Sequence, residues 1–240
     1  MDKNGHQAIV FGFCILLGML LAGCHSGKMN SQGNDQDSSL KFLFLGDSYT
    51  VGQGISKNQS WPNQLVSNLE NSQNQSIEIT IIAQTGWTTQ DLLDAIDQKQ
   101  NQLQLYDMVF LMIGVNDQFQ NKSLLDFQVG FERLLQKSIE LSVNGEDSVI
   151  VLSIPDWGVT SFAKGLDSVQ ISNQIDRFNQ EIWNKSTSFG VRIIDVTDLS
   201  RRVVQNPDWI SVDGLHPSGK MYTEWVNIIM PVVQERLETK

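Results

Sequence analysis

The sequence predicts an α/β domain in which helices cover both faces of a parallel sheet. From Lys41 onward, apolar runs rich in β-branched and aromatic residues alternate with amphipathic stretches of helical period. The connections between successive runs are long enough for a helix, which is the usual connection between parallel strands. The chain has 240 residues, of which 40% are hydrophobic, and this suits one domain with a complete core.

The alternation predicts five strands and five helices. The strands are expected at residues 41–46, 77–83, 107–113, 148–154 and 191–196. The helices are expected at residues 59–73, 88–103, 124–141, 168–188 and 219–238. Pro231 lies inside the last stretch and is expected to kink or shorten that helix. The loops that follow parallel strands share one edge of the sheet, so residues distant in sequence can meet there.

The N-terminal residues have the pattern of a targeting segment. Residues 8–22 carry no charge and follow a short head with Lys3, and fifteen apolar positions are fewer than the ~20 of a membrane-spanning helix. The ending, Leu21-Ala22-Gly23-Cys24, is similar to the bacterial lipobox, at which signal peptidase cuts before a lipidated cysteine. The alternative is an ordinary signal peptide or an N-terminal anchor.

The lipobox reading predicts three parts in the chain. Residues 1–23 would be a lipoprotein signal peptide, residues 24–40 a lipidated Cys24 with a flexible tether, and residues 41–240 the folded domain. The tether is expected because residues 25–39 contain one methionine and no other apolar side chain. The predicted location is the bacterial cell envelope, with the protein attached to a membrane by its lipid anchor.

Charge and cysteine content exclude several classes of partner. The net charge is −10 and the sequence lacks a Lys/Arg cluster, so binding to nucleic acid is not expected. The sequence has two cysteines; Cys14 would leave with the signal peptide and Cys24 would carry the acyl chains. The remaining chain therefore offers no disulfide or cysteine-rich metal site, and no metal or other cofactor is expected.

Ser48 is the candidate nucleophile. It lies directly after the first predicted strand, in Gly46-Asp47-Ser48, where α/β sheets usually place their chemistry. The alternative is a strand-to-helix turn in which Ser48 or Asp47 caps backbone donors.

His216 is the candidate base. The other two histidines, His6 and His25, lie in the targeting segment and beside Cys24, so histidine chemistry in the domain must use His216. Asp213 precedes it by three residues, and one turn could present both side chains on the same side, where the carboxylate would orient the imidazole. The alternative is a loop before a helix capped by Ser218.

Two further loops offer hydrogen-bond donors for an oxyanion. Asn116 follows the third strand in Gly114-Val115-Asn116-Asp117, and Gly86 follows the second strand. The alternatives are an ordinary Asn-Asp turn and a loop glycine before a helix capped by Thr88 or Thr89.

The order of these motifs resembles the SGNH (GDSL-type) hydrolase family over the whole stretch from Lys41 to the C-terminus. The resemblance implies a three-layer α/β/α sandwich with a five-stranded, flavodoxin-like parallel sheet. It implies that Ser48 is the nucleophile, His216 the base and Asp213 its orienting acid. It also implies an oxyanion hole formed by the Ser48 N–H, the Gly86 N–H and the Asn116 side chain.

The substrate is expected to be an ester or O-acyl group of a lipid, glycan or small molecule, with a preference for small acyl groups. Trp87 and Trp157 are predicted to lie in loops at the active edge, as walls of the substrate site or as aromatics that close the core. The alternative function is a non-catalytic envelope lipoprotein that keeps the fold as a binding or scaffolding module. A nucleotide- or flavin-binding module is less favoured, because the first loop lacks a glycine-rich phosphate motif.

Overall fold

The computed structural model describes residues 39–238. Its five strands form one parallel sheet in the order β2-β1-β3-β4-β5. The strands are β1 (Leu40–Gly46), β2 (Ile77–Ala83), β3 (Met108–Met112), β4 (Val149–Leu152) and β5 (Arg192–Ile194). The predicted parallel sheet is therefore confirmed, and each predicted strand agrees with the observed one to within two residues at either end.

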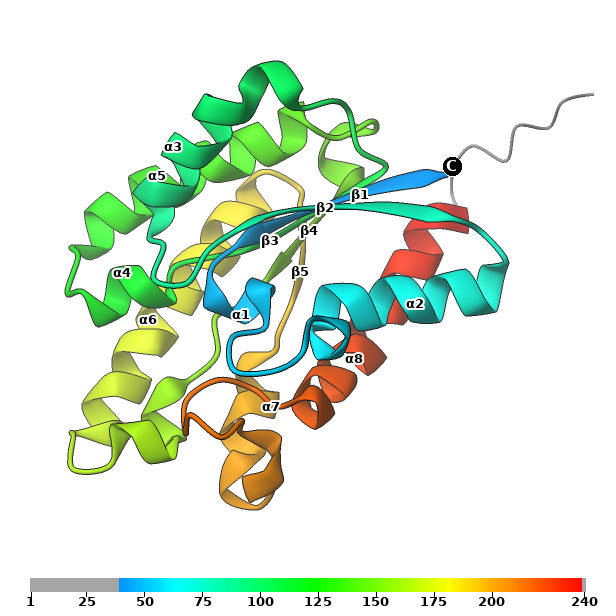
Figure 1. Ribbon diagram of the computed structural model, residues 1–240. Coiled ribbons are helices and arrows are strands. Elements are labelled where there is room, and N and C mark those ends of the chain that lie inside the picture. The colour runs from blue at the N-terminus through cyan, green and yellow to red at the C-terminus, as the bar shows by residue number, and fades with distance from the viewer. Residues whose placement is uncertain (1–38, 239–240) are drawn as a thin grey trace, which may run out of the picture. The chain divides into compact units, whose positions relative to one another are not determined.

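Helices cover both faces of the sheet and form the outer layers (Figure 1). On one face, α2 (Trp61–Gln73) packs against α8 (Gly219–Glu238). On the other, α5 (Leu124–Glu140) packs between α3 (Thr89–Lys99) and α6 (Ser168–Ser188). This is the three-layer α/β/α arrangement with the flavodoxin-like strand order.

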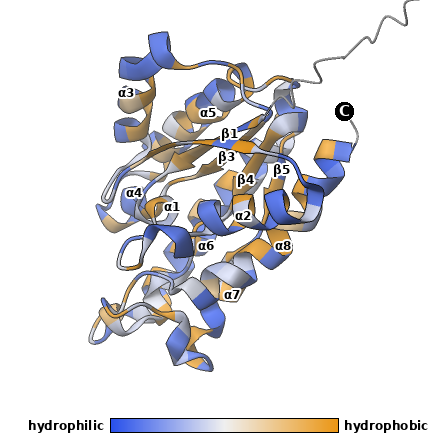
Figure 2. Cartoon of the chain, turned by 45° about the vertical axis from the view of Figure 1, so that its right-hand side comes forward, coloured by the Kyte–Doolittle hydropathy of each residue, from blue (hydrophilic) through white to orange (hydrophobic). Residues whose placement is uncertain are grey.

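The core lies where the central strands meet the helix layers (Figure 2). Every residue of β3 is buried, as expected for a strand with neighbours on both sides and helices above and below. Phe44 of β1 and Phe110 of β3 stack with ring centroids 4.6 Å apart, and Trp61 of α2 meets Phe44 edge-on at 5.1 Å. These aromatic contacts attach α2 to the middle of the sheet.

The prediction that Pro231 shortens the last helix is wrong. Helix α8 continues from Gly219 to Glu238 through Pro231. Pro231 and Asn227, whose carbonyl loses its hydrogen-bond donor, are both exposed, so water can satisfy that carbonyl. Meanwhile Val226, Ile229 and Val233 remain buried against the domain and hold the helix in place.

Short elements lie between the main strands and helices, and most of them are not predicted by the sequence pattern; η2 is the continuation of the helix predicted at residues 88–103. Three are α-helical turns: α1 (Ser48–Val51), α4 (Val115–Phe119) and α7 (Thr197–Ser200). Seven are 3-10 turns: η1 (Lys57–Gln59), η2 (Gln100–Gln102), η3 (Gly145–Ser148), η4 (Trp157–Val159), η5 (Ser161–Ala163), η6 (Arg201–Val204) and η7 (Pro207–Trp209). Several of them carry the residues described below.

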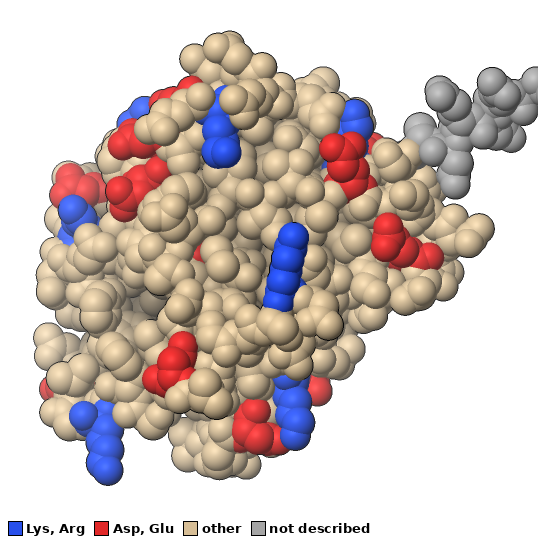
Figure 3. All heavy atoms as spheres, viewed as in Figure 1, with Lys and Arg blue, Asp and Glu red and all other residues tan. Residues whose placement is uncertain are grey.

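The predictions for the signal peptide, for Cys24 and for nearly all of the tether lie outside the described residues. Among residues 39–238, the structure contains no helix long and apolar enough to cross a membrane. On the face in Figure 3, basic and acidic side chains are scattered singly or in pairs of opposite sign, without a broad basic patch. That face offers no surface of the kind that binds nucleic acid.

Candidate active site

Ser48 lies at the topological switch point of the sheet. The chain leaves β1, forms β2 on one side of it, and then returns to form β3 on the other side. The loops after β1 and β3 therefore separate at their carboxyl ends and leave a crevice there. Ser48 begins α1 after β1, and Asn116 lies in α4 after β3, so both residues border this crevice.

The turn at Ser48 depends on its two preceding residues. Asp47 caps α1, because its Oδ1 accepts a hydrogen bond from the Tyr49 N–H at 3.0 Å. A side chain at position 46 would collide with Thr50, since a Cβ there would lie 2.2 Å from Thr50 Oγ1. Gly46 thus lets α1 fold tightly against the end of β1, and Ser48 is placed in the first turn.

The structure brings Ser48, His216 and Asp213 into one chain of hydrogen bonds. His216 Nε2 lies 2.9 Å from Ser48 Oγ, and His216 Nδ1 lies 2.7 Å from Asp213 Oδ2. Ser48 is 4% exposed and His216 is 7% exposed, so little water competes for these bonds. The arrangement allows the imidazole to take a proton from the serine while the carboxylate stabilises the resulting cation.

Asp213 is held in place by further donors. Its Oδ1 accepts from the N–H groups of Leu215 and His216, both at 2.9 Å, and from the Ser211 hydroxyl at 2.8 Å. Partial burial acts to raise the pKa of Asp213, but these bonds and the one from the His216 ring outweigh it and lower the pKa to about 2. Asp213 is therefore an anion over the whole range in which a histidine base operates.

Asn116 lines the same pocket as Ser48 and His216, and Gly86 lies in the neighbouring loop after β2. The Asn116 side chain donates one N–H to the Trp87 carbonyl at 3.0 Å, which leaves its second N–H for another acceptor. Gly86 has a φ of +85°, is exposed, and accepts a bond from Gln120 Nε2 at 3.3 Å. The loop after β2 is thus tied to α4 by two hydrogen bonds.

Asp117, a buried carboxylate to which the sequence analysis assigned no role, strengthens the connection between the loop after β2 and α4. Asp117 is 3% exposed and accepts from both the N–H (2.9 Å) and the hydroxyl (2.7 Å) of Thr89, at the start of α3. Burial raises the pKa of Asp117, although the bonds from Thr89 act in the opposite direction. Its position next to Asn116 in the Gly-x-Asn-Asp motif is the one feature of the sequence that could have indicated a role for Asp117.

Asp47 is a second buried carboxylate, which the sequence analysis considered only as a possible helix cap. It is 1% exposed, and its Oδ2 has no hydrogen-bond partner. Burial raises its pKa from 3.8 to about 7, and the charge of Asp117 adds to the increase, while the Tyr49 N–H opposes it. An ionised Asp47 in this buried position, directly before Ser48, therefore lowers the stability of the fold at neutral pH.

A pocket of about 80 Å³ opens beside Ser48 Oγ. The residues that line it are Ser48, Tyr49, Val115, Asn116, Phe119, Trp157, Leu215 and His216. Trp157 thus lines the pocket beside Ser48, and its predicted role as a wall of the substrate site stays a prediction. Trp87 and Gly86 are not among the lining residues; Trp87 packs against the core.

The loop after β4 positions Trp157. Asp156 is 1% exposed, accepts from the Gly158 N–H at 2.9 Å, and forms an ion pair with Arg201 Nε at 3.0 Å. Arg201 also reaches Asp176 of α6 at 2.6 Å. These bonds join η4, η6 and α6, so the loop whose role the sequence left open supports one wall of the pocket.

Comparison with known proteins agrees with this geometry. Residues 44–223 match the model of the GDSL-like lipase/acylhydrolase family. The chain belongs to this family. Among curated protein sequences, none matches this chain significantly. Because the family consists of lipases and acylhydrolases that share this fold, the chain is an esterase of the SGNH (GDSL-type) class.

Solved structures share the fold at low sequence identity. The esterase EstA from Pseudoalteromonas sp. is 16% identical, with a TM-score of 0.64, over 82% of this chain and 98% of that one. A lipase/acylhydrolase from Enterococcus faecalis is 17% identical, with a TM-score of 0.65, over 82% and 96%. The acetylxylan esterase Axe2 from Geobacillus stearothermophilus is 18% identical, with a TM-score of 0.61, over 82% and 93%.

Among residues 39–238, no group of three or more histidine, cysteine, aspartate or glutamate residues is arranged to hold a metal ion.

Proposed function

We propose that this protein hydrolyses an ester or O-acyl group of a lipid, glycan or small molecule at the cell envelope through an acyl-serine intermediate. The observation that carries the mechanism is the Asp213–His216–Ser48 chain, whose two hydrogen bonds are 2.7 and 2.9 Å long. A hydroxyl is a weak nucleophile, and an adjacent base that is itself oriented by a carboxylate is the usual means of activating it.

In the first step, His216 Nε2 takes the proton of Ser48 Oγ as the oxygen attacks the ester carbonyl. The carbonyl oxygen becomes an anion and accepts bonds from the Ser48 N–H, the Gly86 N–H and the free N–H of Asn116. The Ser48 N–H is in the first turn of α1, where backbone N–H groups lack an intrahelical acceptor. Collapse then passes the proton from His216 to the departing alcohol.

In the second step, water replaces the alcohol. His216 takes a proton from the water as it attacks the acyl-serine, and a second oxyanion forms in the same place. Collapse releases the carboxylic acid and returns the proton to Ser48. Asp213 remains an anion throughout, since its pKa of about 2 is far below neutral pH.

The direct test uses p-nitrophenyl acetate and p-nitrophenyl butyrate with the detergent-solubilised full chain. Ser48→Ala should lower kcat by at least about 10⁴-fold, because only binding and the oxyanion donors remain. Ser188→Ala, which changes an exposed serine at the end of α6, should behave as wild type. Equal turnover by Ser48→Ala and the parent protein would rule out the serine mechanism.

The envelope location rests on the sequence of residues 1–24 and needs its own test. Expression of the chain with a labelled fatty acid in a bacterium should label the mature protein, whereas Cys24→Ala should remain unlabelled and uncleaved. Label incorporated equally into both proteins would show that Cys24 is not the lipidated residue. Either result leaves the proposed esterase chemistry untouched, because Cys24 is not one of the residues to which a catalytic step is assigned.

A further inference from the structure

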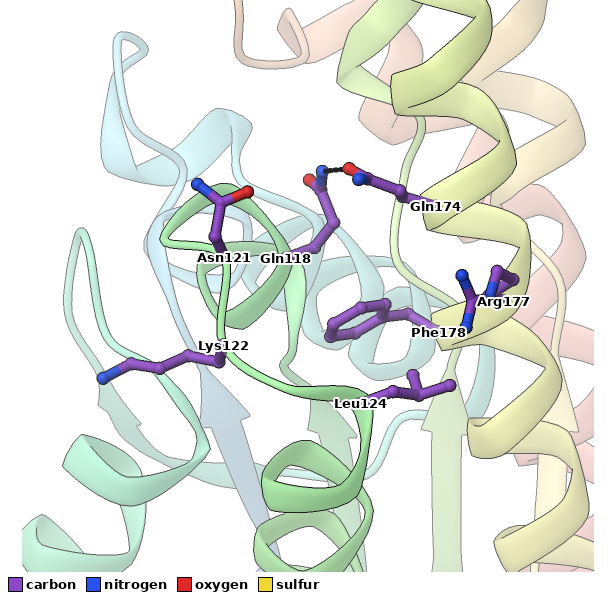
Figure 4. Close-up of a pocket in the computed structure, with 7 residues that line it drawn as sticks. All are labelled: Gln118, Asn121, Lys122, Leu124, Gln174, Arg177 and Phe178. Carbon is purple, nitrogen blue, oxygen red and sulfur yellow. Dashed lines mark hydrogen bonds between the residues drawn. The ribbon is translucent and has the colours of Figure 1, made fainter.

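A second pocket lies directly behind the wall of the active-site pocket. It has a volume of about 230 Å³ and lies between α4, the loop after it, the start of α5 and α6. The residues that line it are Gln118, Asn121, Lys122, Leu124, Gln174, Arg177 and Phe178. Figure 4 shows the Gln118 and Gln174 amides facing each other at one end of it, with the ring of Phe178 below them. This pocket is almost three times the size of the one beside Ser48.

Trp157 and Gln118 separate the two pockets. The Trp157 indole lines the active-site pocket, Gln118 lines the second pocket, and the two are joined by a bond from Trp157 Nε1 to Gln118 Oε1 of 2.7 Å. Gln118 Nε2 in turn donates to Gln174 Oε1 at 2.7 Å. Trp157 is 6% exposed and Gln118 is 5% exposed, so the hydrogen-bonded wall is buried and well fixed.

The space on the Ser48 side of this wall is small. Its volume of about 80 Å³ compares with about 230 Å³ for the second pocket. Its apolar lining, from Val115, Phe119, Trp157 and Leu215, suits hydrocarbon rather than a charged group. A short acyl chain is therefore expected to fill it, and a longer chain to meet the indole of Trp157, which is one of the lining residues.

We propose that Trp157, held in place by Gln118, sets the upper limit of acyl length, so that the substrates are esters of short carboxylic acids. Removal of this wall would join the active-site pocket to the second pocket. There Leu124 and Phe178 offer apolar contacts to a longer chain, while the other lining side chains are polar or charged. The proposal rests on the proposed ester hydrolysis at Ser48, and it concerns which acyl groups that site accepts.

The test compares kcat/KM for p-nitrophenyl acetate, butyrate and octanoate with the full chain. All three esters carry the same p-nitrophenyl leaving group, so a difference between their rates reports on the acyl group. The wild type should favour acetate and butyrate, and Trp157→Ala should raise the octanoate-to-acetate ratio at least about tenfold, since one accommodated methylene alone changes rates by 10–200-fold. Trp157→Phe keeps a ring in the wall and should keep the short-chain preference.

Phe162→Ala is the matched control. Phe162 packs on Trp157 with ring centroids 6.1 Å apart, yet it is not a lining residue of the active-site pocket. Its removal should leave the octanoate-to-acetate ratio unchanged. Gln118→Ala provides a second way to open the wall if Trp157→Ala does not give the thermal unfolding transition of a folded protein.

Two results would overturn the proposal while leaving ester hydrolysis intact. One is a wild type that hydrolyses octanoate as fast as acetate. The other is an unchanged ratio in folded Trp157→Ala and Gln118→Ala, which would mean that the acyl group lies elsewhere. Failure of the proposed function would look different, because no ester of any chain length would then give product that depends on Ser48.

Discussion

The two halves of the site are built in opposite ways. On one side, Ser48 and His216 are almost fully buried and are bonded to each other before any substrate arrives. On the other side, Gly86 is exposed, and a Cβ placed on it would meet no atom within 4 Å. The residues for proton transfer are therefore bonded to one another before substrate binds. The loops that would carry the oxyanion donors are supported by hydrogen bonds on the protein side and are exposed on the solvent side.

The difference follows from what each half must do. Proton transfer between side chains needs short, fixed distances, which the donors to Asp213 and the buried imidazole provide. An oxyanion hole must leave room for an atom that arrives with the substrate, so its support has to come from the far side. Here the support is the pair of bonds between Thr89 and Asp117 and the bond from Asn116 to the Trp87 carbonyl.

The strongest test of the proton-transfer half is Asp213→Asn. This change keeps the size of the side chain but removes the charge that orients and stabilises the imidazole, and we expect kcat to fall about 10⁴-fold. Because the pKa of Asp213 is about 2, its protonation cannot explain any loss of wild-type activity above pH 4. Asp208→Asn, at an exposed ion pair with Lys220, should leave kcat unchanged. A similar kcat for both variants would contradict the assignment.

The second test concerns buried Asp47 and its effect on the pH dependence of folding stability. The pKa of Asp47 rises from 3.8 in the unfolded chain to about 7 in the fold, so the folded state binds the extra proton between these values. Stability from this group therefore falls as pH rises through that window, by about 2–3 kcal/mol between pH 5 and pH 8. Asp47→Asn should lose this dependence.

Urea unfolding at the two pH values measures the effect. The control is Asp94→Asn, which changes an exposed carboxyl on α3 and should retain the wild-type difference between pH 5 and pH 8. If Asp47→Asn shows the same difference as the wild type, Asp47 is not the group that titrates.

The third test addresses the oxyanion half through Asn116→Ala. The loss of one oxyanion donor should lower kcat by about 10²–10³-fold, or about 2.7–4 kcal/mol, with little change in KM. Steady-state rates with p-nitrophenyl acetate give both constants. Asn121→Ala, which removes an exposed amide three residues beyond Gln118, is the control. A near wild-type kcat for Asn116→Ala would remove Asn116 from the oxyanion hole.

The smallest effect is expected for Gly86→Ala. The methyl group has free space around it, but the φ of +85° is a conformation that only glycine adopts without strain. We expect a reduction of kcat of about tenfold or less, because the exposed loop can adjust.

Gly114→Ala is the contrasting variant, because its added Cβ would lie 2.6 Å from the Phe127 ring. This clash should lower the stability of the fold measurably in thermal unfolding.

Most of the fold could be predicted from the chain alone because its signals are local. The apolar runs and helical periods of residues 77–83, 168–188 and 219–238 reproduce the observed β2, α6 and α8. Pro231 shows the limit of such reading: a local helix breaker is tolerated where the lost hydrogen bond faces water and the opposite side of the helix is buried.

By itself, the sequence determined the class of the sheet, the candidate Ser48 and His216, and the family resemblance, because each depends on residue type and order. Only the tertiary structure decided which side chains meet. The hydrogen bonds between Asp117 and Thr89 and between Trp157 and Gln118 join residues 28 and 39 positions apart. The unpaired oxygen of Asp47 depends on its burial. Such contacts arise from the packing of separate loops at one sheet edge, which no local pattern records.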